Sequence, residues 1–133
     1  MTQYRISEAA RLLGVSDDTV RRWIAAEAVE VTQDDAGRQV VAGTELARHA
    51  QSIAVAPGDP SGIGSSARNR MVGLVTAIAS DTVMSQVELQ CGPHRIVSLM
   101  STEAVRDLGL EVGSLAVAVV KATMVIIDTP KGS

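Results

Sequence analysis

The sequence predicts an α+β protein in two parts, a helix-turn-helix unit followed by a compact OB-like β-barrel, and three observations lead to this fold class. Residues 1–50 carry helical patterning, whereas residues 67–133 consist mainly of short stretches rich in Val, Ile and Leu. Between them, Gly, Pro and Ser make up nine of the sixteen residues from Gln51 to Ser66. We therefore expect a domain at 1–50, a flexible linker at 51–66 and a second domain at 67–133.

The composition excludes several classes of protein. Aromatic residues make up 2% of the 133 residues, too few for a platform on which single-stranded nucleic acid stacks. No apolar stretch approaches the roughly 18–20 residues that span a bilayer, and Met1–Arg11 lacks the apolar core of a signal peptide. A single cysteine, Cys91, gives neither an internal disulfide nor a metal site of zinc spacing. We expect a cytoplasmic protein without a membrane partner.

The net charge of −3 is spread along the chain. Residues 1–50 hold six arginines and eight acidic residues, which gives −2, and residues 67–133 hold six basic and six acidic residues. Because no segment is basic overall, any binding to nucleic acid has to come from a local group of arginines.

Two short helices are predicted at the start of the chain. Ser7 can cap a first helix over Glu8–Leu13, and Gly14 suits the left-handed residue that ends it. Ser16 can cap a second helix, whose apolar side would carry Val20 and Trp23 as core residues. Two helices joined by a turn that contains glycine form a helix-turn-helix.

The stretch from Ile6 to Ala25, ISEAARLLGVSDDTVRRWIA, resembles the helix-turn-helix of MerR-type and excisionase-type winged DNA-binding proteins. The resemblance covers residues 4–50. It implies a wing whose strands are Glu30–Val31 and Gln39–Val41, joined by the turn at 34–37, and a third helix from about Thr44 to Ala50.

The resemblance also implies contacts with double-stranded DNA. The second helix would lie in the major groove, with Thr19, Arg21 and Arg22 on or near its exposed face. Arg38, just after the wing turn, would contact a phosphate or the minor groove, and Arg5 would add a backbone contact. The alternative is that these arginines lie on solvated surfaces and pair with neighbouring carboxylates. Because the segment is acidic overall, we expect one copy to bind weakly and a dimer to occupy a two-part site.

The second part of the chain predicts five strands and one helix. The strands are expected at Met71–Ile78, Val83–Leu89, Arg95–Met100, Leu115–Lys121 and Thr123–Ile127, and the helix at Thr102–Leu108 with Ser101 as its cap. This content in about 60 residues favours an OB-like barrel. So small a barrel buries little surface alone, so we expect association to stabilise it.

This segment resembles the Mop domain, of the TOBE type, which occurs in molbindins and in molybdate-dependent regulators. Three blocks in the expected order carry the resemblance: Ser66-Ala67-Arg68-Asn69, Ser101-Thr102-Glu103 and Val120-Lys121-Ala122-Thr123. The resemblance implies a molybdate or tungstate oxyanion as ligand. It also implies sites that lie between subunits, and therefore a homo-oligomer, either a dimer or a larger assembly up to a hexamer formed through the Mop domain.

A tetrahedral dianion has acceptor oxygens and no donors, so hydroxyls, backbone N–H groups and cations should hold it. Ser66, Arg68, Ser101 and Lys121 would supply side chains, and the amides near Ala67, Thr102 and Ala122 would supply further donors. The alternative is that Arg68 and Lys121 are surface charges and that the two serines are simple caps.

These features together predict a molybdate- or tungstate-responsive, DNA-binding transcriptional regulator. Two alternatives remain open: an oxyanion storage protein whose helical part is an interaction module, and a constitutive DNA binder whose barrel only oligomerises. We do not expect an enzyme, because the sequence offers no nucleophile–base pair, no metal cluster and no glycine-rich loop for phosphate.

Overall fold

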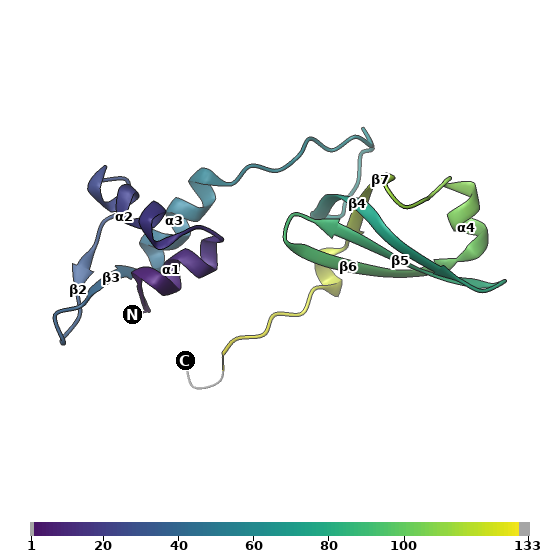
Figure 1. The fold of residues 1–133 in the computed structure, drawn as a ribbon. Helices are drawn as coiled ribbons and strands as arrows, with labels where there is room; N and C mark the ends of the chain where they lie inside the picture. The colour runs from purple at the N-terminus through teal and green to yellow at the C-terminus, as the bar shows by residue number, and fades with distance from the viewer. Residues whose placement is uncertain (1, 131–133) are drawn as a thin grey trace. The chain divides into compact units, whose positions relative to one another are not determined.

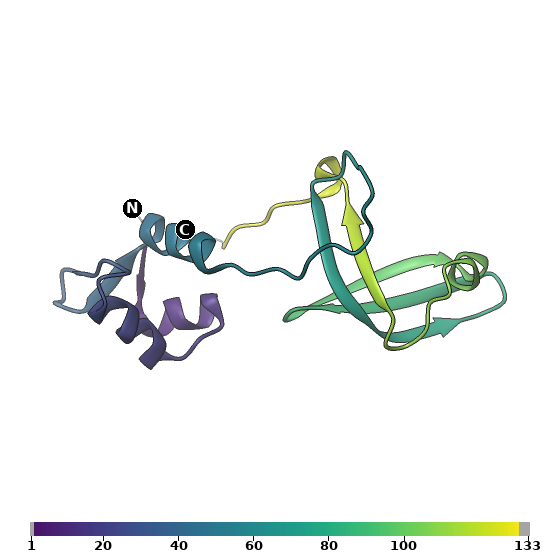
Figure 2. The same cartoon turned by 90° about the horizontal axis from the view of Figure 1, so that it is seen from above.

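The computed structural model describes residues 2–130 and divides the chain into two compact units, Met1–Val55 and Ala56–Ser133. Figures 1 and 2 show the ribbon in two views, with helices and a small sheet in the first unit and a curled sheet in the second. None of the helices that the structure describes has the length and apolar character needed to cross a bilayer.

The first unit contains three helices and three strands among the described residues. In chain order these are β1 Gln3–Arg5, α1 Ile6–Leu13, α2 Asp17–Ala25, β2 Thr32–Gln33, β3 Gln39–Ala42 and α3 Gly43–Ile53. The strands form an antiparallel sheet in the order β1-β3-β2. The helix α3 runs three residues further than the predicted end at Ala50, so the first residues of the expected linker are helical.

Local signals set the ends of α1 and α2. Gly14 has a φ of +69° and ends α1, as predicted. The side chain of Ser16 accepts a hydrogen bond from the N–H of Thr19 at 3.1 Å, which confirms it as the cap of α2. The prediction for Ser7 is wrong, because α1 follows β1 directly and has Arg5 at its cap position, where the Arg5 N–H donates to the Glu8 carboxylate at 3.0 Å.

The strand predicted at Glu30–Val31 lies two residues later. The turn at 34–37 is closed by hydrogen bonds from the Asp34 N–H to the Arg38 carbonyl and from the Gly37 N–H to the Asp34 carbonyl, both at 2.9 Å. Counting outward from this turn, pairing puts Gln33 opposite Gln39 and Thr32 opposite Val40. Strand β1, which the sequence analysis did not predict, pairs with the other edge of β3.

Two small apolar clusters hold the first unit together. Ile6 and Ala10 of α1 pack against Val20 of α2. Ala9, Val29, Val41 and Leu46 form the second cluster, which joins α1 to β3 and α3. Trp23 is half-buried and packs against both clusters, in agreement with its predicted role in the core.

The second unit is a curled antiparallel sheet in the order β6-β5-β4-β7. Its elements are β4 Asn69–Ser80, β5 Met84–Cys91, β6 His94–Ser101, α4 Thr102–Asp107, β7 Leu115–Val120 and the 3-10 helix η1 Ala122–Met124. Residues 69–74 of β4 pair with β7 and residues 74–80 pair with β5, with a bulge between Val75 and Ala77. Figure 2 shows that the sheet bends strongly along β4, as an OB-like fold requires.

The predicted strand Thr123–Ile127 is wrong, and with it the count of five. The 3-10 helix η1 occupies 122–124, and the described residues after it form no strand. Ile126 and Ile127 are 85% and 80% exposed, although both are strongly apolar. A β-branched apolar run forms a strand only where an unpaired sheet edge accepts its hydrogen bonds, and within one chain this run meets none.

The core of the second unit lies under β4 and β5. Val75, Val87, Leu89 and Cys91 are buried together with Val105 of α4. The predicted cap of α4 is confirmed, because the Ala104 N–H donates to the Ser101 Oγ at 3.0 Å.

Candidate functional site

Two of the three sequence blocks predicted to bind an oxyanion lie side by side at one end of the curled sheet. Asn69, the first residue of β4, pairs with Val120, the last residue of β7, and its side-chain amide also donates to the Val120 carbonyl at 3.1 Å. Arg68 immediately precedes β4, and Lys121 immediately follows β7. The two cationic residues therefore flank the last paired position of these antiparallel strands, at the sheet rim.

The two cations have no partner within the described part of the chain. Neither the Arg68 guanidinium nor the Lys121 ammonium has a hydrogen bond or an ion pair among residues 2–130, and both residues are exposed. Unpaired like charges at neighbouring positions repel each other, so this arrangement gains free energy when an anion lies between them.

The other groups predicted at this rim differ in what they have left to donate. Ser66 is exposed, and its hydroxyl has no partner among the described residues. The N–H of Ala122, at the start of η1, also has no acceptor there. The N–H of Ala67 already donates to the Ser65 Oγ at 3.1 Å, and the Ala67 side chain is buried. The rim therefore offers two cations, one hydroxyl and one backbone donor; we call Ser66, Arg68, Lys121 and Ala122 the cationic rim.

The remaining block, which contains Ser101 and Thr102, lies at the other end of β4. Ser101 pairs with Met84, and the neighbouring Ser85 pairs with Ser80, the last residue of β4. The twelve residues of β4 cover roughly 36 Å along the strand. Within one chain, Ser101 and Thr102 therefore lie at the opposite end of β4 from the cationic rim.

Several polar groups of Ser101 and Thr102 already form hydrogen bonds within the chain. The Thr102 hydroxyl donates to the Asp81 carbonyl at 2.8 Å and lies 2.9 Å from the buried Ser85 hydroxyl. The Thr102 N–H donates to the Val83 carbonyl. The Ser101 hydroxyl caps α4 as an acceptor, which leaves its own hydrogen free to be donated. Ser101 therefore keeps a free hydroxyl donor, whereas the partners of the Thr102 hydroxyl could not be predicted from the sequence.

A contact that the sequence analysis did not anticipate holds the segment before the cationic rim. The Arg70 Nε donates to the Asp59 carboxylate at 2.6 Å, and its Nη2 donates to the Ser61 hydroxyl at 2.7 Å. The Arg70 hydrogen bond and then the Ser61 hydrogen bonds hold the pKa of Asp59 far below its ordinary value. Composition alone predicted a flexible linker here, because a Gly/Pro/Ser-rich stretch gives no signal of a contact eleven residues away.

An apolar groove of about 750 Å³ lies on the same unit. It is lined on the sheet by side chains that include Val97, Leu99, Leu115 and Val119, and from the segment before the rim by Pro60 and Ile63. Leu99 is 70% exposed and Leu115 is 58% exposed. Several large exposed apolar side chains on one surface are typical of an interaction site.

The arginines predicted to contact DNA all lie on the surface of the first unit, and three of them have local partners. Arg21 pairs with Asp18 at 3.3 Å, and Arg38 pairs with Asp34 at 3.2 Å. Arg22 donates to the Thr19 hydroxyl at 3.0 Å. All three guanidinium groups stay largely accessible, so each can exchange a weak surface contact for another anion.

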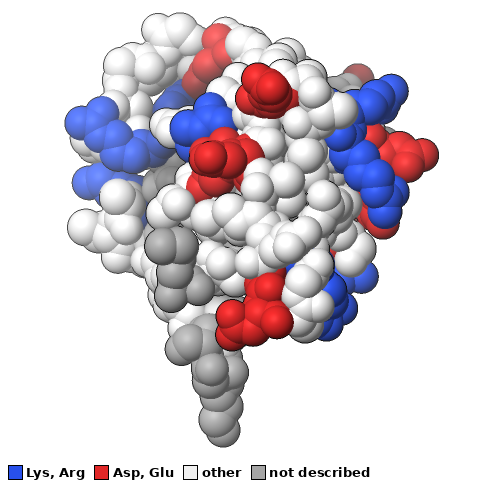
Figure 3. All heavy atoms as spheres, turned by 90° about the vertical axis from the view of Figure 1, so that its left-hand side faces the viewer, with Lys and Arg blue, Asp and Glu red and all other residues white. Residues whose placement is uncertain are grey.

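Charge on this side of the protein is mixed. Figure 3 shows Lys and Arg side chains interspersed with Asp and Glu on the face it presents, rather than one broad basic surface. This agrees with the net charge of −2 over residues 1–50.

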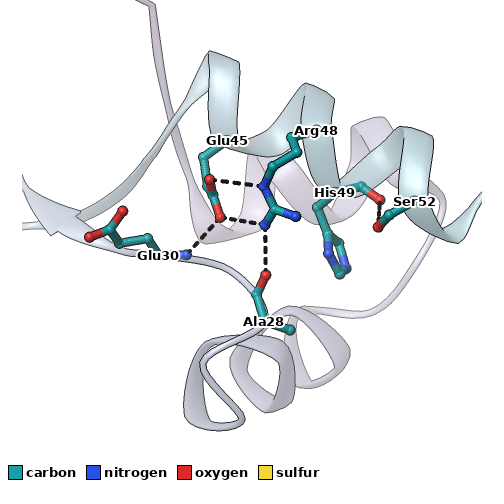
Figure 4. Close-up of polar contacts among 6 residues, drawn as sticks. All are labelled: Ala28, Glu30, Glu45, Arg48, His49 and Ser52. Atoms are coloured by element: carbon teal, nitrogen blue, oxygen red, sulfur yellow. Dashed lines mark hydrogen bonds and ion pairs between the residues drawn. The ribbon is translucent and has the colours of Figure 1, made fainter.

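A polar network fixes α3 to the segment that follows α2. Figure 4 shows Arg48 donating to the Glu45 carboxylate, at 2.7 Å from its Nη2, and to the Ala28 carbonyl at 2.9 Å. The Glu45 carboxylate also accepts from the Glu30 N–H at 3.2 Å. The Arg48 side chain, followed by the Glu30 N–H, lowers the pKa of Glu45. The Glu30 N–H, which was predicted to lie in a strand, is thus bonded to a side chain and not to a neighbouring strand.

The described residues give no sign of a metal centre. No group of three or more His, Cys, Asp or Glu among residues 2–130 is placed to hold a metal ion. Cys91 is buried, and its Sγ lies 3.6 Å from the Met71 carbonyl oxygen.

Comparison with known proteins shows to which family the second unit is similar. The TOBE domain family matches residues 65–127. Molybdenum-pterin-binding protein 3 of Clostridium pasteurianum is 36% identical over 63 residues, which cover 47% of this chain and 93% of that protein. Through this segment the chain belongs to the TOBE-domain family.

Two further relatives share the TOBE segment. The molybdenum transport protein ModE of Herbaspirillum seropedicae is 38% identical over 65 residues, which are 48% of this chain but 24% of that protein. A crystal structure of the cytoplasmic molybdate-binding protein ModG with molybdate bound is 42% identical, with a TM-score of 0.45, and the match covers 48% of this chain and 46% of ModG. All three matches span about half of this chain, and the chain spans about a quarter of the length of ModE.

Proposed function

We propose that this protein binds molybdate, or tungstate of similar shape and charge, between the TOBE segments of an oligomer, and that the bound oxyanion controls binding of the first unit to DNA. The observation that carries the proposal is the pair of unpartnered cations, Arg68 and Lys121, which flank the Asn69–Val120 pair at the rim of a segment whose relatives are named for molybdenum. Molybdate is the ligand that the relatives and the donor chemistry both favour.

The donor set fits a tetrahedral dianion. Such an ion accepts hydrogen bonds at four oxygens and donates none, so its site needs cations, hydroxyls and amides and excludes carboxylates. The cationic rim offers these groups, and none of the described ion pairs places a carboxylate on Arg68 or Lys121. Because the rim is exposed in one chain, the ion would be hydrated on its outer side unless another surface covers it.

A second copy is the covering surface we propose. Ser101 has a free donor, but it lies at the far end of β4 from the cationic rim of its own chain. A neighbouring copy can place its Ser101 over the rim. This completes the set of donors around the ion and removes water from it. The apolar groove and the exposed Ile126 and Ile127 support association, because these surfaces cost free energy while they face water.

The first unit supports DNA binding through a winged helix-turn-helix arrangement. α1 and α2 are joined by the short turn at 14–16, and the hairpin β2–β3 follows as a wing would. Thr19, Arg21 and Arg22 lie along α2, which we assign as the helix that enters the major groove. Arg38 beside the hairpin turn and Arg5 before α1 are the proposed backbone contacts.

Coupling between ligand and DNA follows from assembly. A site completed by two copies binds its ligand only in the assembled state, so the ligand stabilises that state. An assembly presents two or more first units to a two-part DNA site, and the second contact then benefits from a high effective concentration.

Calorimetric titration with molybdate, tungstate and sulfate tests the ligand. We expect saturable heat with molybdate and tungstate and a much weaker response to sulfate. Sulfate is a smaller tetrahedron, because its S–O bonds are shorter than the metal–oxygen bonds of the other two ions. No heat with any of the three would leave the TOBE segment as an oligomerisation domain alone and would contradict the proposal.

A mobility-shift titration against salt tests the DNA contact. With about three to four phosphate contacts per copy, the logarithm of the affinity should fall with a slope near −3 per copy against the logarithm of salt concentration. Sequence-dependent binding that changes with molybdate supports the regulator.

Oxyanion storage is the second candidate, and two observations favour it. Three of the proposed DNA-contacting arginines have local partners, and a molybdenum-pterin-binding relative consists almost entirely of the matched segment. Saturable molybdate binding without any DNA binding at low salt would select storage, with the first unit as an interaction module.

A further inference from the structure

A three-residue contact holds the glycine-containing segment that precedes the cationic rim. The Asp59 carboxylate accepts from the Arg70 Nε at 2.6 Å and, on its other oxygen, from the Ser61 N–H at 2.9 Å and the Ser61 hydroxyl at 2.7 Å. The Ser61 hydroxyl in turn accepts from the Arg70 Nη2 at 2.7 Å. The Arg70 side chain is only 21% exposed, against 53–59% for the arginines of the other described ion pairs. We call Asp59, Ser61 and Arg70 the latch.

The latch closes a loop around the rim residues. Its two ends are Asp59, before the loop, and Arg70, the second residue of β4. The loop between them contains Ser66, Ala67 and Arg68, and on the far side it is fixed by the pairing of Asn69 with Val120. Gly62 and Gly64 add no side chains to the middle of the loop, and a Cβ at either position would meet no atom within 4 Å. At these two positions nothing packs against the loop, so its path there depends on how its two ends are fixed.

Strand pairing brings the latch close to the ligand groups. Arg70 is the second residue of β4 and lies two positions after Arg68 in the sequence. Arg70 pairs with Val119, two residues before Lys121, so the latch and the two cations belong to one corner of the sheet. In this corner Arg70 is neutralised by Asp59, whereas Arg68 and Lys121 have no carboxylate partner among the described residues.

We propose that the latch positions the loop at 62–69 so that Ser66 and Arg68 face Lys121 in the geometry that the oxyanion needs. This inference rests on the proposed function, and it assigns a role to Asp59 and Ser61, which lie outside the matched segment 65–127. Arg70 is then a positioning residue: its Nε and Nη2 donate to Asp59 and Ser61, and its charge is paired with the Asp59 carboxylate.

Charge and position make opposite predictions for the loss of Asp59, which makes the inference testable. If Arg70 acts as a third cation, Asp59→Asn frees its positive charge and tightens molybdate binding. If the latch positions the loop, Asp59→Asn loosens the loop and weakens binding. For Arg70→Gln both readings predict weaker binding, so the pair of variants separates them.

The experiment measures molybdate affinity by calorimetry on the full chain with Asp59→Asn, with Arg70→Gln and with both substitutions. Each single variant should weaken binding roughly tenfold, the lower end of what loss of a positioning partner costs a bound ion. The double variant should be no weaker than either single one, because both remove the same contact. Asp59→Glu keeps the carboxylate and should recover most of the affinity.

Two further measurements separate positioning from a general loss of fold. The thermal midpoint of each variant should match that of Asp35→Asn, an exposed carboxylate in the first unit with no hydrogen bond or ion pair among the described residues. Hydrogen exchange without ligand should speed up at the amides of 62–66 in Asp59→Asn and stay unchanged in β4 and β5.

The outcomes are distinct. Tighter or unchanged binding in Asp59→Asn overturns the positioning role while leaving the proposed function intact. Absence of molybdate binding by the unmodified protein overturns the proposed function and, with it, the role of the latch in ligand binding. Unchanged exchange at 62–66 in Asp59→Asn shows that the latch does not hold the loop and also overturns the inference.

Discussion

Two variants that each remove a different half of the proposed oxyanion site should restore it when they are combined in one assembly. The first variant is Arg68→Ala with Lys121→Ala, which removes both cations of the rim. The second is Ser101→Asp, which keeps a good cap for α4 but places a negative charge where a dianion should bind. Alone, each variant should bind no molybdate, because every site of its assembly lacks one half.

The size of the rescue follows from the split arrangement of the site. Each proposed site takes its rim from one copy and Ser101 from the neighbouring copy. A site is therefore intact when a Ser101→Asp chain supplies the rim and an Arg68→Ala, Lys121→Ala chain supplies Ser101. With equal amounts and random mixing, about one quarter of the sites meet both conditions, whether the assembly is a dimer or a ring.

The assay is calorimetry on co-expressed variants, each with a different tag so that mixing is verified. The expected result is a stoichiometry near one quarter of that of the unmodified protein, at an unchanged affinity. Ser16→Asp, which makes the same change at the cap of α2 in the first unit, is the matched control and should bind normally. No recovery in verified mixed assemblies would refute a site shared between copies, and normal binding by Ser101→Asp alone would remove Ser101 from it.

Three further predictions concern the remaining parts of the molecule. Arg21→Ala with Arg22→Ala should abolish the DNA mobility shift and leave molybdate affinity unchanged, and a normal shift would refute the assignment of α2. Gly73→Ala should destabilise the second unit by about 1–3 kcal/mol in denaturant unfolding, because its Cβ would lie 2.5 Å from the Gln90 carbonyl oxygen and 2.6 Å from the Cys91 Sγ, whereas Gly58→Ala meets nothing within 4 Å and should match the unmodified protein. The pKa of Glu45 is lowered in the folded state, so its contribution to stability is present above the ordinary value of 4.5 and is lost as the pH falls through the folded pKa. The free energy of unfolding of the first unit should therefore decrease as the pH falls into the acid range, and it should decrease less in Glu45→Gln. The same decrease in that variant would show that the network of Figure 4 does not contribute.

Three features with a local cause were predicted correctly from the sequence, whereas the cap expected at Ser7 was not. The caps at Ser16 and Ser101 and the end of α1 at Gly14 depend on residues within one turn, and all three were predicted. The nearness of Arg68 and Lys121 within one chain depends on the pairing of β4 with β7; the family resemblance assigned both residues to an oxyanion site but did not show that one chain brings them together.

Features with a distant cause could not be predicted. The latch joins residues eleven positions apart through side chains in a stretch whose composition predicts only flexibility. The strand expected at 123–127 has the right residues but no free edge that reaches it within one chain. Thr102 has the residue type of an oxyanion ligand, yet its hydroxyl is used by Asp81 and Ser85, which no sequence pattern shows.

Native mass spectrometry with and without molybdate tests most directly whether the oxyanion is held between copies of this chain. The account predicts that molybdate adds mass only to assemblies of two or more chains, never to the monomer, and that it shifts the population toward the assembled state. A monomer that carries molybdate with the affinity of the assembly, or assemblies that take up none, would contradict the account.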